Sequence, residues 1–276
     1  MLLRRVLFAA ISGLVVSCHA TGEIASSAGV PIAFENAQLD ASVAQPPAVI
    51  AVAVTEEAKE PQPVCPSGML LVDGDYCPDV EQTCLEWMDP PGPYQHFRCK
   101  RYQQPATCKG ARKHERFCID ERERTEDNSD VPRNHMSWTS AQSLCRSDGA
   151  RLCMTREWQF ACEGEEMRPY PYGWERDSST CNADISKGLG RVGSLVDHRA
   201  PASAHPNCVS AFGVHDMAGN VDEWATIDGA PKGVREVMKG SWWMPGRNSC
   251  RSAQGGHGAM YGGTESGARC CADPLH

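Results

Sequence analysis

The fifteen cysteines are the most chemically versatile residues of this 276-residue chain. Thiolates bind soft metals or act as nucleophiles, whereas thiols in an oxidising compartment pair as disulfides. No C-x-x-C occurs in the sequence, so the usual spacings of zinc ribbons and thioredoxin-like centres are missing. With Cys18 set apart, an even fourteen cysteines remain from Cys65 onward. In an exported protein this pattern predicts structural disulfides.

The other reactive residue types form no recognisable catalytic motif. The nine histidines are scattered, and no H-x-D or H-x-E is present for an iron site built from two histidines and a carboxylate. The sequence also has no G-x-S-x-G and no phosphate-binding glycine loop. Hydrolase and nucleotide-dependent activities are therefore not indicated.

The first eighteen residues have the pattern of an export signal. Arg4 and Arg5 precede a short apolar stretch, 6–16, which is too short to span a bilayer. It ends in V-V-S-C, which resembles a bacterial lipobox and predicts a signal peptide over 1–18 with a lipidated Cys18. The alternative is an ordinary signal peptide in which Cys18 has no special role. A lipid on Cys18 would be the only membrane attachment.

This signal places the protein in the cell envelope. His19 rather than Asp follows Cys18, which favours the outer membrane and leaves its periplasmic or surface face open. Removal of Arg4 and Arg5 leaves 25 basic against 35 acidic residues. A phosphate backbone is repelled by that balance, so nucleic acid is excluded as a partner.

The elements that must position any site lie in the second part of the chain. Residues 19–64 are rich in Ala, Val, Ser, Pro and Glu, with Phe34 as the only aromatic residue, and predict a flexible tether. Residues 65–276 contain all seven tryptophans and predict one domain.

Two helices and two short strands are predicted in this domain. Ser137 is placed to cap a helix through Ala141 and Cys145 that ends near Asp148-Gly149. Thr155 is placed to cap a second helix that has Trp158, Ala161 and Cys162 on one face. Short strands are expected at 237–238 and 241–243. The rest is punctuated by Gly and Pro, so disulfides must fasten it.

Ordered sequence blocks resemble the formylglycine-generating-enzyme (sulfatase-modifying factor) family. The most specific is F-G-V-H-D-M-A-G-N-V-D-E-W at 212–224, and G-A-R-L-C-M-T-R-E-W at 149–158 is similarly close. Further matching blocks stand in the family's order at 69–74, 136–138, 170–173, 181–184, 239–242, 250–253 and 267–270. The cysteine-rich stretch 77–118 fits the family less well.

This resemblance implies an α+β, C-type-lectin-like fold with much irregular structure and many disulfides. Members of the family include an oxidase that converts a substrate cysteine to formylglycine, enzymes of iron-dependent sulfur chemistry, and non-catalytic binding or scaffold proteins. The fold alone does not choose among these activities.

The residues matching the oxidase's reactive centre depart from its pattern. The family oxidase holds copper(I) with two cysteines, whose positions here are occupied by Met244 and Ser249. Cys250 stands one residue late, so a copper site is not expected and Cys250 is interpreted as a half-cystine. The weak catalytic candidates are Cys250, Met244 and Ser241, and Ser241 is better interpreted as a turn residue.

Calcium is the metal that the resemblance favours. Asp216, Gly219, Val221 and Glu223 stand where the family places two side-chain oxygens and two backbone carbonyls, and calcium prefers such hard ligands. Asn182 with Ala183 is a weaker second candidate. The alternative is a glycine turn whose carboxylates face water.

The leading hypothesis is an exported lipoprotein that binds a peptide, protein or glycan in a cleft. The residues expected to line the cleft are Trp242, Trp243, Met244 and Asp222, the last standing where the oxidase has an aromatic residue. A metal-dependent oxidoreductase that uses Met244 and a free Cys250 is the alternative. A structural envelope component without a small ligand is a third possibility.

Overall fold

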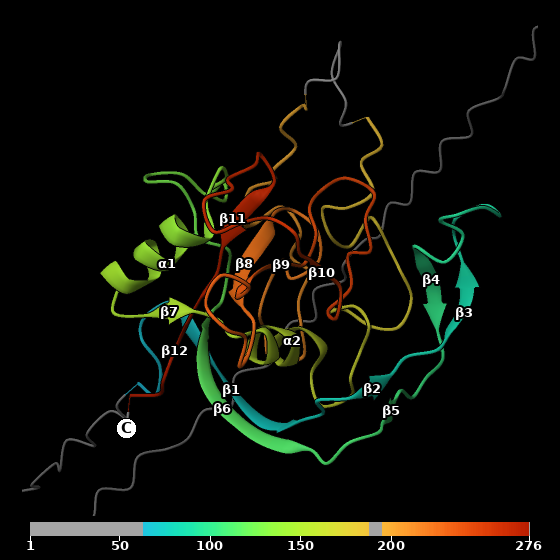
Figure 1. The fold of residues 1–276 in the computed structure, drawn as a ribbon, viewed down its shortest axis with the longest axis horizontal. Helices are drawn as coiled ribbons and strands as arrows, with labels where there is room; N and C mark the ends of the chain where they lie inside the picture. The colour runs from blue at the N-terminus through green and yellow to red at the C-terminus, as the bar shows by residue number, and fades with distance from the viewer. Residues whose placement is uncertain (1–62, 188–194, 276) are drawn as a thin grey trace, which may run out of the picture. The chain divides into compact units, whose positions relative to one another are not determined.

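The computed structural model describes residues 63–187 and 195–275 (Figure 1). The predicted signal peptide, Cys18 and the tether as far as residue 62 lie outside these ranges and stay predictions. Among the residues that are described, no helix is both long enough and apolar enough to cross a membrane.

The first sheet joins the beginning and the end of the described domain. Its strand order is β1-β6-β12-β7, and every pair is antiparallel. The longest pairing runs in unbroken register from Met69 opposite Asp120 to Tyr76 opposite Lys113. The four strands are β1 (Met69–Tyr76), β6 (Lys113–Asp120), β12 (Cys270–Ala272) and β7 (Arg151–Leu152).

The second sheet has the strand order β10-β9-β8-β11 (Figure 1). Its central strand β8 pairs antiparallel with β9 and parallel with β11. The strands are β8 (Asp222–Thr226), β9 (Glu236–Lys239), β10 (Ala253–Gln254) and β11 (Ser266–Ala268). The strand predicted at 237–238 is thus confirmed within β9. The one predicted at 241–243 is wrong, because Ser241 has φ +64°, a left-handed conformation that ends extended structure.

Helix α1 (Trp138–Ser147) begins and ends where its sequence predicts. The Ser137 hydroxyl accepts the Ser140 backbone N–H at 3.1 Å, and the Ser140 hydroxyl in turn accepts the Ser137 N–H at 2.9 Å. These reciprocal bonds satisfy N–H groups that the first turn of a helix leaves without partners. At the other end Gly149 has φ +72°, which closes the helix.

Helix α2 (Thr155–Glu163) is capped by a residue from a distant segment. Thr155 is its first residue and not its cap, so that detail of the prediction is wrong. The Asp228 carboxylate accepts the Arg156 backbone N–H at 3.0 Å and the Thr155 hydroxyl at 2.7 Å. Negative charge at this end also complements the helix dipole. The helix contacts β1, β6 and β8, and its buried Trp158 belongs to the core between the sheets.

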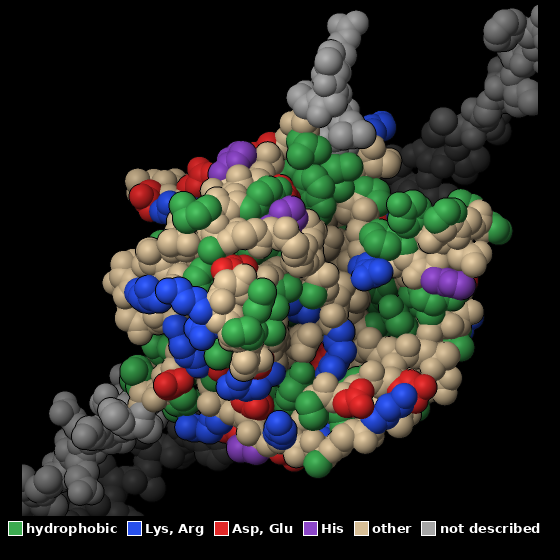
Figure 2. All heavy atoms as spheres, in the orientation of Figure 1, with side chains coloured by type: hydrophobic (Ala, Val, Ile, Leu, Met, Phe, Trp, Pro, Cys, Tyr) green, Lys and Arg blue, Asp and Glu red, His purple; other side chains and the backbone are tan. Residues whose placement is uncertain are grey.

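A cysteine-rich excursion between β1 and β6 forms two small ribbons. The first pairs β2 (Val80–Glu81) with β5 (Thr107–Cys108), and the second pairs β3 (Cys84–Trp87) with β4 (Cys99–Tyr102). Hydrophobic side chains gather over the β3–β4 ribbon in Figure 2. The exposed ones are Leu85, Trp87, Met88 and Tyr94.

Fourteen cysteines form seven disulfides within the described residues, as the sequence predicts. Two of them fasten the excursion, one links Cys65 ahead of β1 to β6, and three tie α1, α2 and the segment before α2 to the C-terminal part of the chain. The pairs are Cys65–Cys118, Cys77–Cys108, Cys84–Cys99, Cys145–Cys270, Cys153–Cys271, Cys162–Cys250 and Cys181–Cys208. A domain with so many short elements gains its constraint from these links. The predicted disulfide-rich α+β fold with much irregular structure is confirmed.

Candidate functional site

A cavity of about 400 Å³ lies where the second sheet meets the excursion. Its walls come from three separate parts of the chain: the two central strands and the turn after β9, the loop that leads to β10, and the β3–β4 ribbon. The lining side chains include Phe97, Asp222, Met238, Ser241, Trp242 and Arg247.

Asp222 is the buried acid of this cavity. It is the first residue of β8 and is only 1 % exposed. The Ser241 backbone lies near its carboxylate, and Oδ2 has no hydrogen-bond partner among the described residues. Burial, and then the charge of nearby Glu265, raises the pKa of Asp222 to about 8. An unpartnered carboxylate oxygen beside a cavity marks a place where a ligand group can bind.

Two other buried ionisable side chains flank Asp222. The Glu265 carboxylate accepts the Tyr261 hydroxyl at 2.5 Å. The Lys239 ammonium donates to the Ser252 carbonyl at 2.6 Å and lies 5.3 Å from the centroid of the Trp158 ring. Burial lowers the pKa of Lys239 to about 7. Lys239 therefore has its own partners and forms no ion pair with Asp222.

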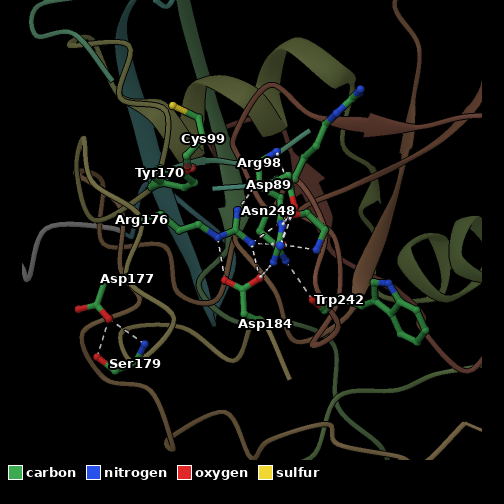
Figure 3. Close-up of polar contacts among 12 residues, drawn as sticks. Asp89, Arg98, Cys99, Tyr170, Arg176, Asp177, Ser179, Asp184, Trp242 and Asn248 are labelled. Carbon is green, nitrogen blue, oxygen red and sulfur yellow. Dashed lines mark hydrogen bonds and ion pairs between the residues drawn. The ribbon is translucent and has the colours of Figure 1, made fainter. Parts of the chain in front are cut away.

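A network centred on Arg176 holds the loop above the cavity (Figure 3). Its guanidinium donates to Asp184 at 2.8 Å, to the Gly246 carbonyl at 2.9 Å and to Asn248 Oδ1 at 2.8 Å. Asn248 in turn donates to the Trp242 carbonyl at 3.0 Å. These bonds fix the backbone on both sides of Arg247, so the loop is positioned before any ligand arrives.

The same network connects the loop to the β3–β4 ribbon. Arg98 pairs with Asp89 at 2.6 Å and with Asp184 at 3.3 Å. Phe97, which directly precedes Arg98 in the sequence, lines the cavity. The Arg247 guanidinium lies 5.1 Å from the centroid of the Phe97 ring, a cation–π contact.

The structure brings together half of the four predicted cleft residues. Asp222 and Trp242 line the cavity, together with the weak candidate Ser241. Trp243 is fully buried, so its expected place in the cleft is wrong. Met244 is half-buried and does not line the cavity. Ser241 has a left-handed backbone conformation that ends the extended structure. The segment after it therefore does not follow a strand, and Trp242 faces the cavity while Trp243 packs in the interior.

Cys250 is bonded to Cys162 of α2 and is completely buried. It therefore has no thiolate to offer, which contradicts the hypothesis that a free Cys250 acts with Met244. The interpretation as a half-cystine holds instead. The physical reason is packing, since the Cys162 face of α2 is directed into the core that contains Cys250.

Glu223, one of the predicted calcium ligands, is bonded to other side chains of the protein. Both Glu223 oxygens are engaged, Oε2 by the Trp158 indole N–H at 2.6 Å and Oε1 by the buried Arg269 guanidinium at 2.7 Å. Asp216 keeps an unpartnered oxygen, Oδ2, and burial raises its pKa to about 7. The Arg269 guanidinium already supplies the positive charge that calcium would bring. Glu223 thus does not fit a calcium site with Asp216, Gly219 and Val221.

The second calcium candidate fits no better. The Asn182 carbonyl accepts the Asn220 backbone N–H at 2.8 Å, and its side-chain amide donates to Asn220 Oδ1 at 2.8 Å. Asn182 and neighbouring Ala183 also lie close to Gly219, which leaves no room for a side chain there. Across the residues that the structure describes, no three His, Cys, Asp or Glu side chains converge to hold a metal.

Sequence reasoning missed Phe97, Arg247 and Arg176. Phe97 lies in the cysteine-rich stretch 77–118, whose sequence fits the family less well. Arg247 falls between Met244 and Ser249, where the resemblance points to no functional residue. One signal for Phe97 was available in the sequence. Cys84 and Cys99 enclose a segment rich in Pro and aromatic residues, and a disulfide between them would hold that segment as a loop.

Comparison with known proteins agrees with the sequence blocks. Residues 76–274 match the Sulfatase-modifying factor enzyme 1-like domain. The chain is 28 % identical over 120 residues to the inactive C-alpha-formylglycine-generating enzyme 2 of Mus musculus, covering 42 % of this chain and 38 % of that protein. It is 32 % identical over 102 residues to a hercynine oxygenase of Mycobacterium tuberculosis, covering 36 % of this chain and 22 % of that enzyme.

Among solved structures, the chain resembles that of CarF with 16 % sequence identity and a TM-score of 0.48, over 76 % of this chain and 98 % of CarF. The chain spans well under half the length of the two relatives named above. The match over 76–274, however, includes most of the described domain, both helices and the cavity. The chain therefore belongs to the Sulfatase-modifying factor enzyme 1-like domain family.

Proposed function

We propose that this chain is a non-catalytic binding module of the cell envelope, which holds its ligand in the cavity lined by Asp222 and Trp242. The observation that carries the proposal is the Cys162–Cys250 disulfide in a domain that also has an open cavity. The cysteine that could have supplied a reactive thiolate forms a structural link, while the cavity offers space for a ligand. The mouse relative whose name calls it inactive is a precedent for such a module.

Three properties of the cavity suit binding. Its loop is held by Arg176 before a ligand arrives, which reduces the ordering cost on association. Trp242 and Phe97 offer aromatic contact area. The unpartnered Asp222 oxygen offers a hydrogen-bonding point at a fixed position. A peptide, a segment of a protein or a glycan is the ligand class proposed.

A steric block of the cavity tests this function. Gly255 lines the cavity, and a Cβ built on it meets no atom within 4 Å, so Gly255→Phe fills open space without disturbing the fold. Gly258 is equally open but lies outside the lining, which makes Gly258→Phe the matched control. The full chain is screened on arrays of short peptides and of glycans. We expect a defined ligand set that Gly255→Phe loses and Gly258→Phe keeps.

Two outcomes would overturn the binding function. One is that the wild-type chain retains no peptide or glycan, or that both variants retain the same set. The other is chemical change in a retained ligand, measured by mass spectrometry after incubation in air. Such turnover would support the alternative hypothesis of a metal-dependent oxidoreductase.

The envelope location is proposed from the predicted lipobox. With a lipid on Cys18, the full chain expressed in a bacterial host partitions with the membranes and resists a high-salt wash. The Cys18→Ala variant is expected in the soluble fraction. If the variant and the wild-type chain fractionate alike, the anchor is disproved and the binding function is unaffected.

A further inference from the structure

We propose that the cavity recognises a cationic group, an ammonium or a guanidinium, with Asp222 as its ionic anchor and Trp242 as its aromatic wall. This inference rests on the proposed binding function and names the chemistry of the ligand group that enters deepest.

The first argument is an imbalance of charge inside the cavity. Asp222 is buried beside a second buried carboxylate, Glu265, and neither forms an ion pair with any described Lys or Arg. The nearest ammonium, Lys239, is held by the Ser252 carbonyl and the Trp158 ring. Burial of a carboxylate without a countercharge keeps Asp222 largely protonated at neutral pH, because its pKa is raised to about 8, and a cation from the ligand stabilises the ionised form.

The second argument is the hydrogen-bonding state of Asp222. The Ser241 backbone lies near its carboxylate, and Oδ2 has no hydrogen-bond partner in the described part of the chain. An ammonium or guanidinium is a charged donor and forms with a carboxylate one of the stronger hydrogen bonds available in proteins. Neutral hydroxyl groups could also donate, but only a cation also stabilises the ionised form of Asp222, whose pKa burial raises to about 8.

The third argument is the order of groups from the interior to the rim. Asp222 is almost fully buried, Trp242 is half-buried, and Arg247 is exposed. Aromatic faces attract cations, and the contact of Arg247 with Phe97 is an example within the same wall. An acid inside and a base at the rim select one orientation, with the cationic end of the ligand inward and a neutral or anionic end outward.

A bound metal ion is a weaker explanation of the same carboxylates. Hard divalent ions take six or more oxygen ligands. Asp222 and Glu265 supply two side chains, and Glu265 is already bonded to Tyr261. No third acidic, cysteine or histidine side chain joins them among the described residues.

The test uses the full chain and five blocked pentapeptides, acetyl-Gly-Gly-X-Gly-Gly-amide, in which X is Lys, Arg, Gln, norleucine or Glu. Dissociation constants are measured by titration calorimetry at neutral pH. We expect the Lys and Arg peptides to bind roughly tenfold or more tightly than the Gln and norleucine peptides, and the Glu peptide least tightly.

Asp222→Asn keeps the shape of the side chain and is expected to abolish the preference of the cavity for Lys and Arg over Gln. Asp127→Asn removes one charge from an exposed carboxylate that does not line the cavity and is expected to keep that preference. Glu265→Gln serves as a second variant, with an intermediate loss, should Asp222→Asn fail to fold. Thermal melting of each variant establishes that it is folded.

The outcomes separate this inference from the function on which it rests. If ligands from the array are retained and blocked by Gly255→Phe, but the pentapeptides show no cation preference or Asp222→Asn leaves it unchanged, the cationic subsite is disproved and the binding module stands. If the array and the pentapeptides both give no binding, the two proposals fall together. Equal binding of Gln and Lys peptides would assign the cavity to neutral donors.

Discussion

At the scale of single residues, one cysteine and one aspartate account for most of what distinguishes this chain. Cys250 is bonded to Cys162 and buried, so a residue that could carry redox chemistry carries structure instead. Asp222, by contrast, is a buried acid of β8 that forms no ion pair with a described residue, so it does not serve the structure in the way that Cys250 does. A buried carboxylate without a partner lowers the stability of the folded state, so stability alone does not account for an aspartate at this position.

Asp222 makes the stability of the protein depend on pH. The folded state raises its pKa from 3.8 to about 8, so the folded chain holds a proton that the unfolded chain has lost between these values. Because the folded state binds more protons, the free energy of unfolding falls as pH rises through this window. Asp216 acts in the same direction up to about pH 7. Lys239, with its pKa lowered to about 7, acts in the opposite direction only above that pH.

We therefore predict that Asp222→Asn flattens this dependence. Urea denaturation between pH 5 and pH 7 is expected to show a fall in the free energy of unfolding for the wild-type chain. The fall is smaller for Asp222→Asn, since the shares of Asp216 and of other buried carboxyls with a raised pKa, such as Glu123 and Glu163, remain. Parallel curves for the two proteins would show that the Asp222 carboxyl titrates normally in the folded state.

At the scale of elements, the β3–β4 ribbon contributes one wall of the cavity. It is closed by Cys84–Cys99 and connected to the cavity loop through Arg98, Asp184 and Arg176. It contributes Phe97 to the cavity and presents exposed apolar side chains on its surface (Figure 2). The ribbon thus extends a binding site whose interior is formed by the second sheet.

Loss of the ribbon disulfide is predicted to act locally. In Cys84→Ser/Cys99→Ser, hydrogen exchange should increase across residues 84–102, because the two short strands lose a link worth about 2–4 kcal/mol. Exchange in β1, β6 and α2 should stay at the wild-type level, since these elements have their own disulfides and core contacts. Peptide binding should weaken as Phe97 loses its fixed position.

The matched control is Cys65→Ser/Cys118→Ser, which removes a disulfide of the first sheet and leaves the cavity walls intact. It should lower stability without a selective effect on the ribbon. Unchanged exchange over 84–102 in the ribbon variant would mean that the Arg98 and Arg176 ion pairs hold it without the disulfide.

At the scale of the whole molecule, the disulfides connect segments that regular structure leaves apart. The described domain has two helices of ten and nine residues and strands of at most eight. Three disulfides span sequence separations of 88 to 125 residues. Such links limit the unfolded chain most strongly, because the loops they close are long.

Folding is therefore predicted to require an oxidising compartment. The full chain exported from a bacterial host should show no alkylatable thiol from Cys65 onward, and a non-reducing peptide map should return the seven pairs. The same chain produced in a reducing cytoplasm should be largely unfolded by near-ultraviolet circular dichroism. A folded, fully reduced protein would show that the core alone is sufficient, and an alkylated Cys250 would reopen the oxidoreductase alternative.

The sequence by itself determined the ends of one helix, the disulfide-rich character of the domain and its family. Ser137 and Gly149 mark the ends of α1, because caps and left-handed closures depend on a few neighbouring residues. The even number of cysteines from Cys65 onward and the ordered motifs identified a disulfide-rich domain and its family. Only the tertiary structure decided which cysteines pair, that Asp228 caps α2 from 72 residues away, and that Trp242 faces the cavity while Trp243 is buried. These features depend on packing between distant segments, and no short pattern of residues encodes the distance between them.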